Sequence, residues 1–507
     1  MKNLPGSLFQ LLKGNPTDIQ SYRINMLLKE IENIENSINS LQTAPSEDAA
    51  ISFACDYKDS GNGVKSFANY LMACSNEFQK SHNLFMSPYV AIVQSSMYGK
   101  TRLLREIARS YYRVVYVCLR EEWSTGYPPR TLGAFTHLFV EPKKDAGSVQ
   151  FSRILADRFK RLVLSALENL QDPLRPDVPT AMPKQESVLF PSDLIGDKLW
   201  NNELHKAWTG DCDVLYPKGE SHSPQMVVSA IDEARYTLNE KSYVNNRSLF
   251  RYIRKAAKLC ALELPSHIRF MVIFVDTSSR IQNFPPSLYL DPSYRSTEFQ
   301  DEGRRLELFR PHILSHTFDV HFTRVLPRGT IDLRPLIDSK EWLSAGRPTM
   351  KELSSRADAT LELKLQGGAS EPTRTVDRLA IILARIGAHL SPVSHYTSEM
   401  VSGNMATLLD VNLTRETCIT AFVSEPALAR AAGRIWWKGR VLEDNLIPAL
   451  HEGVVSGAFN KGRDGELVAQ VIILLAFDKV CNALDKDIGE MVPLRLVITE
   501  LLPDELD

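Results

Sequence analysis

The sequence lacks the marks of several classes of protein. Its seven cysteines include no CxxC pair, so neither a zinc site nor a disulfide framework is expected, and a reducing compartment fits best. Lys and Arg number 59 against 61 for Asp and Glu, so no overall basic excess points to nucleic acid. No internal repeat of fixed period is present. A composition of 44% hydrophobic and 24% charged residues excludes wholesale disorder.

Long hydrophobic runs are also missing. The most apolar stretch, residues 467–477 (LVAQVIILLAF), has about half the length of the ~20-residue helix that spans a membrane, and it predicts a buried helix. Residues 1–16 (MKNLPGSLFQLLKGNP) lack the continuous apolar core of a secretory signal. These absences predict an intracellular chain, in the cytoplasm or the nucleus, with no membrane partner. The alternative is a chain delivered by an unconventional route to the cytoplasm or nucleus of a host cell.

Between residues 89 and 122 the pattern alternates between strand and helix. A β-branched run at 89–96 (YVAIVQSS) precedes an amphipathic helix at 97–111, and a second strand follows at 114–122 (VVYVCLREE). This order predicts the α/β class, with a mostly parallel sheet covered by helices. A further apolar strand (HIRFMVIFVDTSS) contains Asp276 near its end.

The chain divides into three expected parts. Residues 1–84 are an N-terminal helical segment, residues 85–350 are the α/β core, and residues 351–507 are a mainly helical C-terminal domain. Within the core, the Pro-rich residues 172–224 are an expected insertion, and residues 225–262 are expected to be helical. Amphipathic helices of the first and last parts could bind a protein partner, and the alternative is that they pack within their own domains.

The strongest chemical signal lies at residues 94–101 (QSSMYGKT), between the first strand and its helix. A phosphate-binding loop has the pattern GxxxxGK[ST] in this context, and its backbone N–H groups bind phosphates at the positive end of the helix dipole. Lys100 would neutralise the β- and γ-phosphates and Thr101 would coordinate Mg²⁺. Gln94 stands where the first glycine is expected and could distort the loop. The predicted binding set for ATP or GTP is Gln94, Ser95, Ser96, Gly99, Lys100, Thr101 and Arg102.

Hydrolysis also needs a carboxylate for Mg²⁺ and a general base. Asp276, at the end of an apolar strand, is the predicted Mg²⁺ ligand together with Thr101. No glutamate follows Asp276, so Glu121 and Glu122 at the end of the second strand are the candidate bases; the alternative is two solvated loop residues. Arg347, in a Gly-Arg-Pro sequence, is the candidate cation for the transition state, with a structural arginine as the alternative.

Two other patterns suggest nucleic-acid chemistry. Asp358 with Glu362 and Lys364 has the spacing of a metal-dependent nuclease, but this segment also predicts a helix. A run of basic residues interleaved with aromatic ones could bind a phosphate backbone, although it is more often the solvated face of a helix. The basic residues of this run are Arg247, Arg251, Arg254, Lys255 and Lys258.

The chain resembles the Crinkler/RHS-type P-loop NTPases of filamentous fungi and oomycetes, which include relatives of retrotransposon hot spot proteins. The resemblance covers roughly residues 85–480 and rests on the segments QSSMYGKTRLLREIAR, GYPP, VDTSS, SAGRPT and GELVAQVIILLAFDK. It implies a P-loop NTPase core, with Lys100 and Thr101 as nucleotide and Mg²⁺ ligands and Asp276 as the acid of the metal strand. Some members are secreted effectors that act in host nuclei, and others are associated with transposons. No LFLAK-type translocation header is visible, which argues against secretion as an effector. No nuclease-like domain is visible, so nuclease activity is not expected of this chain.

The sequence therefore supports two hypotheses of different classes. The first is a Mg²⁺-dependent protein that binds ATP or GTP and hydrolyses it slowly, coupled to a conformational change. The second is a non-catalytic interaction protein, a scaffold whose degenerate loop binds nucleotide structurally or not at all. Gln94 and the absence of a glutamate after Asp276 favour the second hypothesis.

Overall fold

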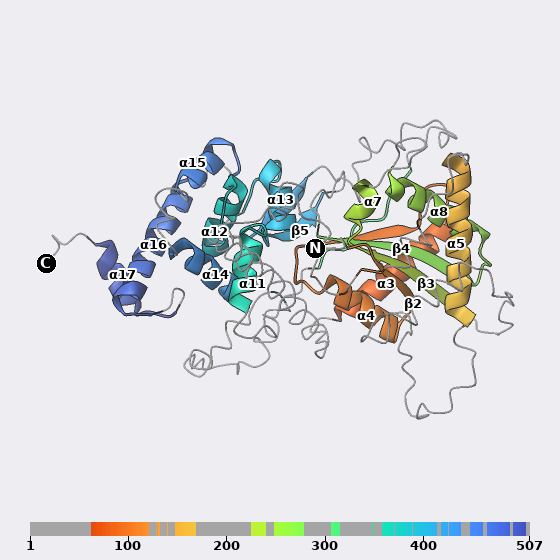
Figure 1. Cartoon of the computed structure of the whole chain (residues 1–507), viewed down its shortest axis with the longest axis horizontal. Coiled ribbons are helices and arrows are strands. Elements are labelled where there is room, and N and C mark those ends of the chain that lie inside the picture. The colour runs from red at the N-terminus through yellow and green to blue at the C-terminus, as the bar shows by residue number, and fades with distance from the viewer. Residues whose placement is uncertain are drawn as a thin grey trace, which may run out of the picture.

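The computed structural model places the described residues in two connected units, a sheet covered by helices and a mainly helical unit (Figure 1). We call them the core (residues 62–314) and the C-terminal unit (residues 357–502). The structure describes residues 62–120, 128, 130–131, 139, 148–168, 225–239, 248–277, 306–314, 347, 357–369, 371–387, 389–412, 417–423, 425–437, 447–459, 464–486 and 490–502.

Four parallel strands form the sheet of the core. They are β1 (Tyr89–Val93), β2 (Arg113–Cys118), β3 (Gln225–Asp232) and β4 (Ile268–Asp276), in the spatial order β1-β4-β3-β2. Nearly every strand residue is buried, because helices cover both faces of the sheet. The predicted α/β class with a parallel sheet is confirmed.

Strand β3 corrects one sequence-based prediction. Residues 225–262 were expected to be helical, but the first eight form the central strand β3, paired with both β2 and β4. Its apolar run is buried on both faces, so it needs no alternation of polar and apolar residues, and such a run resembles a buried helix in sequence. Helices α7 (Arg235–Asn239) and α8 (Leu249–Glu263) follow it.

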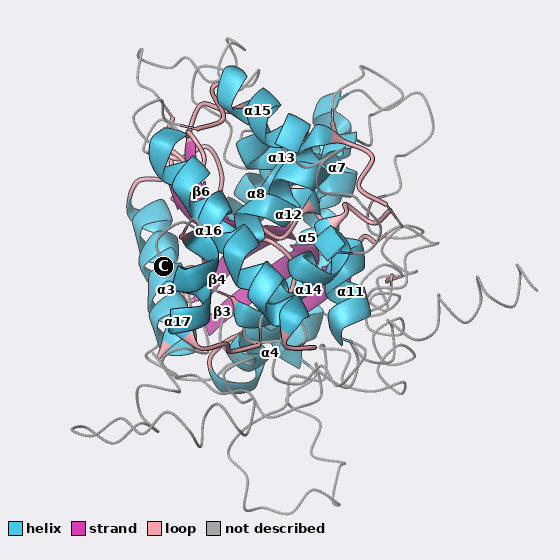
Figure 2. Ribbon diagram, turned by 90° about the vertical axis from the view of Figure 1, so that its left-hand side faces the viewer, coloured by secondary structure: helices cyan, strands magenta, loops and turns pink. Residues whose placement is uncertain are grey.

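The helices of the core lie on both faces of the sheet (Figure 2). The connection from β1 to β2 runs from one edge of the sheet to the other, and the connection from β2 to β3 runs in the opposite direction. Right-handed crossovers therefore place α4 (Lys100–Ser110) on one face and α5 (Ser148–Glu168) on the other, where α5 packs against α8. Helix α3 (Gly63–Lys80) packs against α4 and β4, so the last part of the expected N-terminal segment belongs to the core.

The C-terminal unit is mainly helical, as the sequence predicts. Helix α12 is almost completely buried and packs against five other helices of the unit. A short antiparallel pair, β5 (Thr407–Val411) and β6 (Cys418–Ala421), lies next to the core. The helices are α11 (Ala357–Leu365), α12 (Thr375–Ile386), α13 (His395–Gly403), α14 (Pro426–Trp437), α15 (Ile447–Val455), α16 (Asp464–Ala483) and α17 (Leu494–Leu501).

The apolar run at 467–477 lies in α16, which is a helix as predicted but is not fully buried. Val468, Ile472 and Ile473 are each about half exposed, because only one face of α16 packs on the unit. None of the described helices combines the length and the apolar composition that crossing a lipid bilayer requires. The predicted insertion at 172–224 lies outside the described residues.

Candidate functional site

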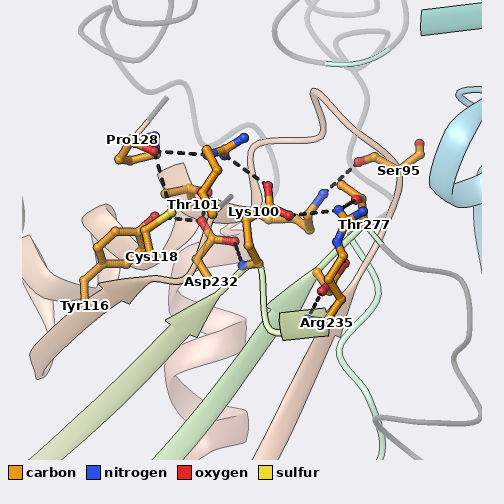
Figure 3. Close-up of polar contacts among 12 residues, drawn as sticks. Ser95, Lys100, Thr101, Tyr116, Cys118, Pro128, Asp232, Arg235 and Thr277 are labelled. Atoms are coloured by element: carbon orange, nitrogen blue, oxygen red, sulfur yellow. Dashed lines mark hydrogen bonds and ion pairs between the residues drawn. The ribbon is translucent and has the colours of Figure 1, made fainter. Parts of the chain in front are cut away.

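Polar side chains gather where the parallel strands of the core end. The carboxyl ends of parallel strands meet at one edge of a sheet, and ligands bind at this edge in open α/β folds. Here β1 leads into residues 94–99 and then into α4, while β3 ends at Asp232 and β4 at Asp276. Figure 3 shows Lys100, Thr101 and Asp232 together above the strand ends.

The segment 94–99, which we call the loop, has two residues in the left-handed backbone region. Met97 has φ 71° and Gly99, at the N-cap of α4, has φ 76°. A Cβ on Gly99 would meet only Arg102 Cβ at 3.9 Å, so the backbone conformation rather than space favours glycine. No side chain caps the first turn of α4, whose N–H groups form an anion-binding end. Arg102 itself pairs with Glu106 within α4 at 2.9 Å.

The side chain of Lys100, the first residue of α4, bonds back to the loop. Its Nζ donates hydrogen bonds to the main-chain oxygens of Gln94 (2.7 Å) and Ser95 (2.9 Å). Burial lowers the pKa of Lys100 to about 8, although the carboxylates of Asp232, Glu233 and Asp276 act in the opposite direction. The ammonium group is therefore poorly solvated, and an added anion would stabilise its charge.

Asp232 is the acid that contacts Thr101. Its Oδ2 accepts hydrogen bonds from Thr101 Oγ1 and from Tyr116 OH, both at 2.7 Å, and its Oδ1 accepts one from Glu233 N at 2.9 Å. The sequence-based prediction placed Asp276 in this role. The hydroxyl of Thr101 and the carboxylate of Asp232 are the adjacent hard oxygen donors that could hold a divalent cation.

Asp276 belongs to the same cluster of side chains but has other partners. Its Oδ2 accepts a hydrogen bond from the backbone N–H of Arg235, and its Oδ1 lies 3.3 Å from Arg235 Nε. The carboxylate is completely buried. It therefore fixes Arg235 at the start of α7, whereas the hydroxyl of Thr101 bonds to Asp232.

Glu233 lies between two arginines. Its Oε1 is 3.1 Å from Arg120 Nη2, and its Oε2 accepts a hydrogen bond from Arg235 Nη2 at 2.8 Å. Burial alone would raise the pKa of Glu233, but the charges of Arg120, Arg235 and Lys100 hold that pKa below its usual value. The carboxylate is therefore ionised at neutral pH.

Sequence reasoning missed both Asp232 and Glu233. The signal was present as an apolar run (MVVSAI) followed directly by Asp-Glu. It was hidden by the incorrect assignment of this segment to a helix. The predicted bases Glu121 and Glu122 lie outside the described residues.

Gln94 joins the loop to β5 of the C-terminal unit. Its Nε2 donates to Leu408 O (2.9 Å) and Leu314 O (2.7 Å), while its Oε1 accepts from Leu408 N and Ser95 N, both at 2.9 Å. The side chain is fully buried. Its amide thus pairs with Leu408 as the backbone of a neighbouring strand would.

Arg347 contacts the loop from the same side as β5. It is fully buried and forms an ion pair with Glu425 at 2.7 Å. It donates hydrogen bonds to Ser96 O (2.8 Å) and Ser95 Oγ (3.1 Å), and its guanidinium lies 4.7 Å from the centre of the Tyr98 ring. The predicted role as a transition-state cation does not fit this enclosed, paired geometry. We call these contacts of Gln94 and Arg347 the loop junction.

Two of the basic residues that could form a nucleic-acid surface, Arg254 and Lys258, make packing contacts instead. Arg254 is only 4% exposed and stacks 4.6 Å from the centre of the Phe250 ring, which is itself buried. Lys258 Nζ donates to Phe85 O at 2.8 Å. The Lys258 bond, together with a bond from Arg254 Nη1 to Met86 Sδ at 3.0 Å, anchors α8 to the segment before β1. Arg251 and Lys255 are partly exposed on the same helix, and Arg247 lies outside the described residues.

The nuclease-like spacing also has a structural explanation. Asp358, Glu362 and Lys364 all lie on α11, as the alternative interpretation predicted. Across the described part of the chain, no three His, Cys, Asp or Glu side chains are grouped as a metal site.

Two family models match the chain, one for each unit. The first, described as Domain of unknown function (DUF8735), matches residues 59–153 and 195–314. The second, described as Domain of unknown function (DUF8736), matches residues 369–504. Neither curated proteins nor solved structures gave a match. The chain is therefore similar to two families without an assigned activity. The loop junction connects the first matched region, which contains Gln94, to the second, which contains Leu408 and Glu425.

Proposed function

We propose that the chain binds a Mg²⁺-bound nucleoside triphosphate, ATP or GTP, at the loop and hydrolyses it slowly. The observation that carries this proposal is the 2.7 Å hydrogen bond between Thr101 Oγ1 and Asp232 Oδ2. It joins the residue after the loop lysine to an acid at the end of a buried strand. A phosphate-binding loop needs this pair of oxygens for its metal.

The phosphates have a matching set of groups. The uncapped first turn of α4 offers N–H donors and the positive end of the helix dipole. Lys100 offers an ammonium group whose hydrogen bonds, among the residues that the structure describes, go to main-chain oxygens of the loop. A charge-assisted bond to a phosphate oxygen is stronger than a bond to a neutral carbonyl, so the nucleotide can compete for this group.

Thr101 and Asp232 fit Mg²⁺. In phosphate sites this ion uses one or two protein oxygens and completes its shell with phosphate oxygens and water, so a cluster of several acids is not required. When bound, Mg²⁺ would neutralise charge on the β- and γ-phosphates. Tyr116 and the Glu233 N–H hold the Asp232 carboxylate in one orientation.

Glu233 is the general base in this proposal. Water attacks the γ-phosphorus, its proton passes to Glu233, and the bond from phosphorus to the oxygen bridging the β- and γ-phosphates breaks. A carboxylate whose pKa is held low by two arginines is a weak base, which is consistent with slow turnover. The proposal keeps the resemblance to Crinkler/RHS-type P-loop NTPases as a hypothesis, with Asp232 in the role first given to Asp276.

Calorimetric titration of Mg-ATP and Mg-GTP, together with phosphate release, tests the proposal. Lys100→Ala should weaken binding by about 1–3 kcal/mol through the loss of a charge-assisted contact. Glu233→Gln should bind as the wild type does and lose about 10²–10⁴-fold in turnover. Asp232→Asn should lose Mg²⁺ dependence, whereas the matched variant Asp276→Asn should keep it. A folded wild type that binds no nucleotide at millimolar concentration would instead support the scaffold hypothesis.

A further inference from the structure

Arg235 bridges the ends of two strands at the candidate site (Figure 3). Its Nη2 donates to Glu233 Oε2 (2.8 Å) and to Thr277 Oγ1 (2.7 Å), and its Nε lies 3.3 Å from Asp276 Oδ1. Glu233 follows β3, whereas Asp276 ends β4 and Thr277 follows it. The guanidinium therefore lies across the gap between these strand ends.

The sheet order brings this gap close to the loop. Strand β4 is the direct neighbour of β1, and Asp276 is paired in register with Val93, the last residue before the loop. The next residue, Gln94, provides a main-chain oxygen that accepts a hydrogen bond from Lys100. The residues that hold Arg235 are thus neighbours of those that hold Lys100.

The charges around Arg235 would otherwise oppose a terminal phosphate. Glu233 and Asp276 are both ionic partners of Arg235, and both also act electrostatically on Lys100. A γ-phosphate brought near them would be repelled by these carboxylates unless a cation lay between them. Arg235 lies between the carboxylates of Glu233 and Asp276 and provides this positive charge. Its planar fork of N–H donors also matches the geometry of phosphate oxygens.

Arg235 is also more accessible than the other arginines of the site. Its side chain is 44% exposed, compared with 16% for Arg120 and 0% for Arg347. Its Nε and Nη2 have partners, while Nη1 has none in the part of the chain that the structure describes. One side of the fork is therefore open to a ligand.

We propose that Arg235 binds the terminal phosphate and makes the site select a nucleoside triphosphate over a diphosphate. This inference rests on the proposed function. As Arg235 turns toward the phosphate, its Nη2 leaves Glu233 Oε2, and this oxygen is then open to the attacking water. Selection of the triphosphate and positioning of the water are then one event.

A pair of matched variants tests this inference. Arg235→Gln and Arg120→Gln each remove one arginine from Glu233, and Arg235→Gln also removes an ion pair to Asp276 at the end of β4, the neighbour of β1. Calorimetry would give the Kd of the Mg²⁺ complexes of ADP and of a non-hydrolysable ATP analogue. Arg235→Gln should weaken binding of the analogue about tenfold to a hundredfold and leave that of Mg-ADP within about threefold. Arg120→Gln should leave the ratio of the two affinities unchanged.

Three results separate this inference from the proposed function. Equal weakening of both nucleotides by Arg235→Gln would overturn the inference, as would an equal change of the ratio in Arg120→Gln. A wild type that binds neither nucleotide would overturn the proposed function, and the inference with it. If Arg235→Gln does not fold, Arg235→Lys gives the same readout. It retains the charge between Glu233 and Asp276 but loses the fork, so it should selectively weaken binding of the analogue.

Discussion

Replacement of Arg347 by methionine should destabilise the chain strongly. The side chains of Arg347 and Glu425 are 0% and 1% exposed, so no water can replace the lost guanidinium. Removing one partner of a buried ion pair costs about 3–5 kcal/mol, because the other charge stays buried without compensation. The carbonyls of Ser96 and Met405 also lose a donor, at about 1 kcal/mol each.

The double variant Arg347→Met, Glu425→Leu is the matched control. Replacing both members of a buried pair by apolar side chains of similar size is often neutral, since the uncompensated charge is gone. We therefore expect the double variant to be more stable than Arg347→Met alone. The coupling between the two sites should be on the order of 3 kcal/mol.

Urea unfolding followed by tryptophan fluorescence measures these differences, because Trp436 and Trp437 lie on α14, which starts next to Glu425. Hydrogen exchange of the Leu408 N–H, which bonds to Gln94 Oε1, reports on the loop junction itself. A loss of turnover in Arg347→Met at unchanged stability would refute this reasoning. It would return Arg347 to the role of a transition-state cation.

Two further predictions concern the nucleotide site. Because the pKa of Lys100 is about 8 and a phosphate favours the ammonium form, binding of Mg-ATP at pH 8.5 should take up protons, whereas binding at pH 6.5 should not. Calorimetry in buffers of different ionisation enthalpy measures the uptake, and uptake that persists in Lys100→Arg would contradict the assignment. Tyr116→Phe removes one of the hydrogen bonds to Asp232 and should raise the Mg²⁺ concentration for half-maximal nucleotide binding several-fold, for a contact of about 1 kcal/mol. Tyr112→Phe, which loses a bond to Ala68 O on α3, is the control and should leave the Mg²⁺ titration unchanged.

Features that depend on neighbouring residues were predictable from the sequence. The change from a β-branched run to an amphipathic helix located β1 and α4, and the apolar run before Asp276 located β4. The Gly99-Lys100-Thr101 sequence between this strand and this helix located the loop. Each of these signals is contained in a window of about 15 residues or fewer.

The partners of the loop were not predictable in the same way. Asp232 and Asp276 both end apolar strands, and only the sheet order shows which of them meets Thr101. Strand order depends on contacts between residues far apart in the chain. The buried position of Arg347 likewise depends on Glu425, 78 residues later. A local pattern carries no information about such pairs.

Gln94 has a consequence for how this chain can change over evolution. Its amide matches the backbone N–H and C=O of Leu408, so glycine at position 94 would leave both of these groups without this partner. Conversely, a different C-terminal unit could replace the present one only if it offered the same pair of backbone groups at that place. The two family regions are therefore expected to be inherited as a pair rather than exchanged separately. A substitution at position 94 and a change in the backbone of β5 would have to occur together.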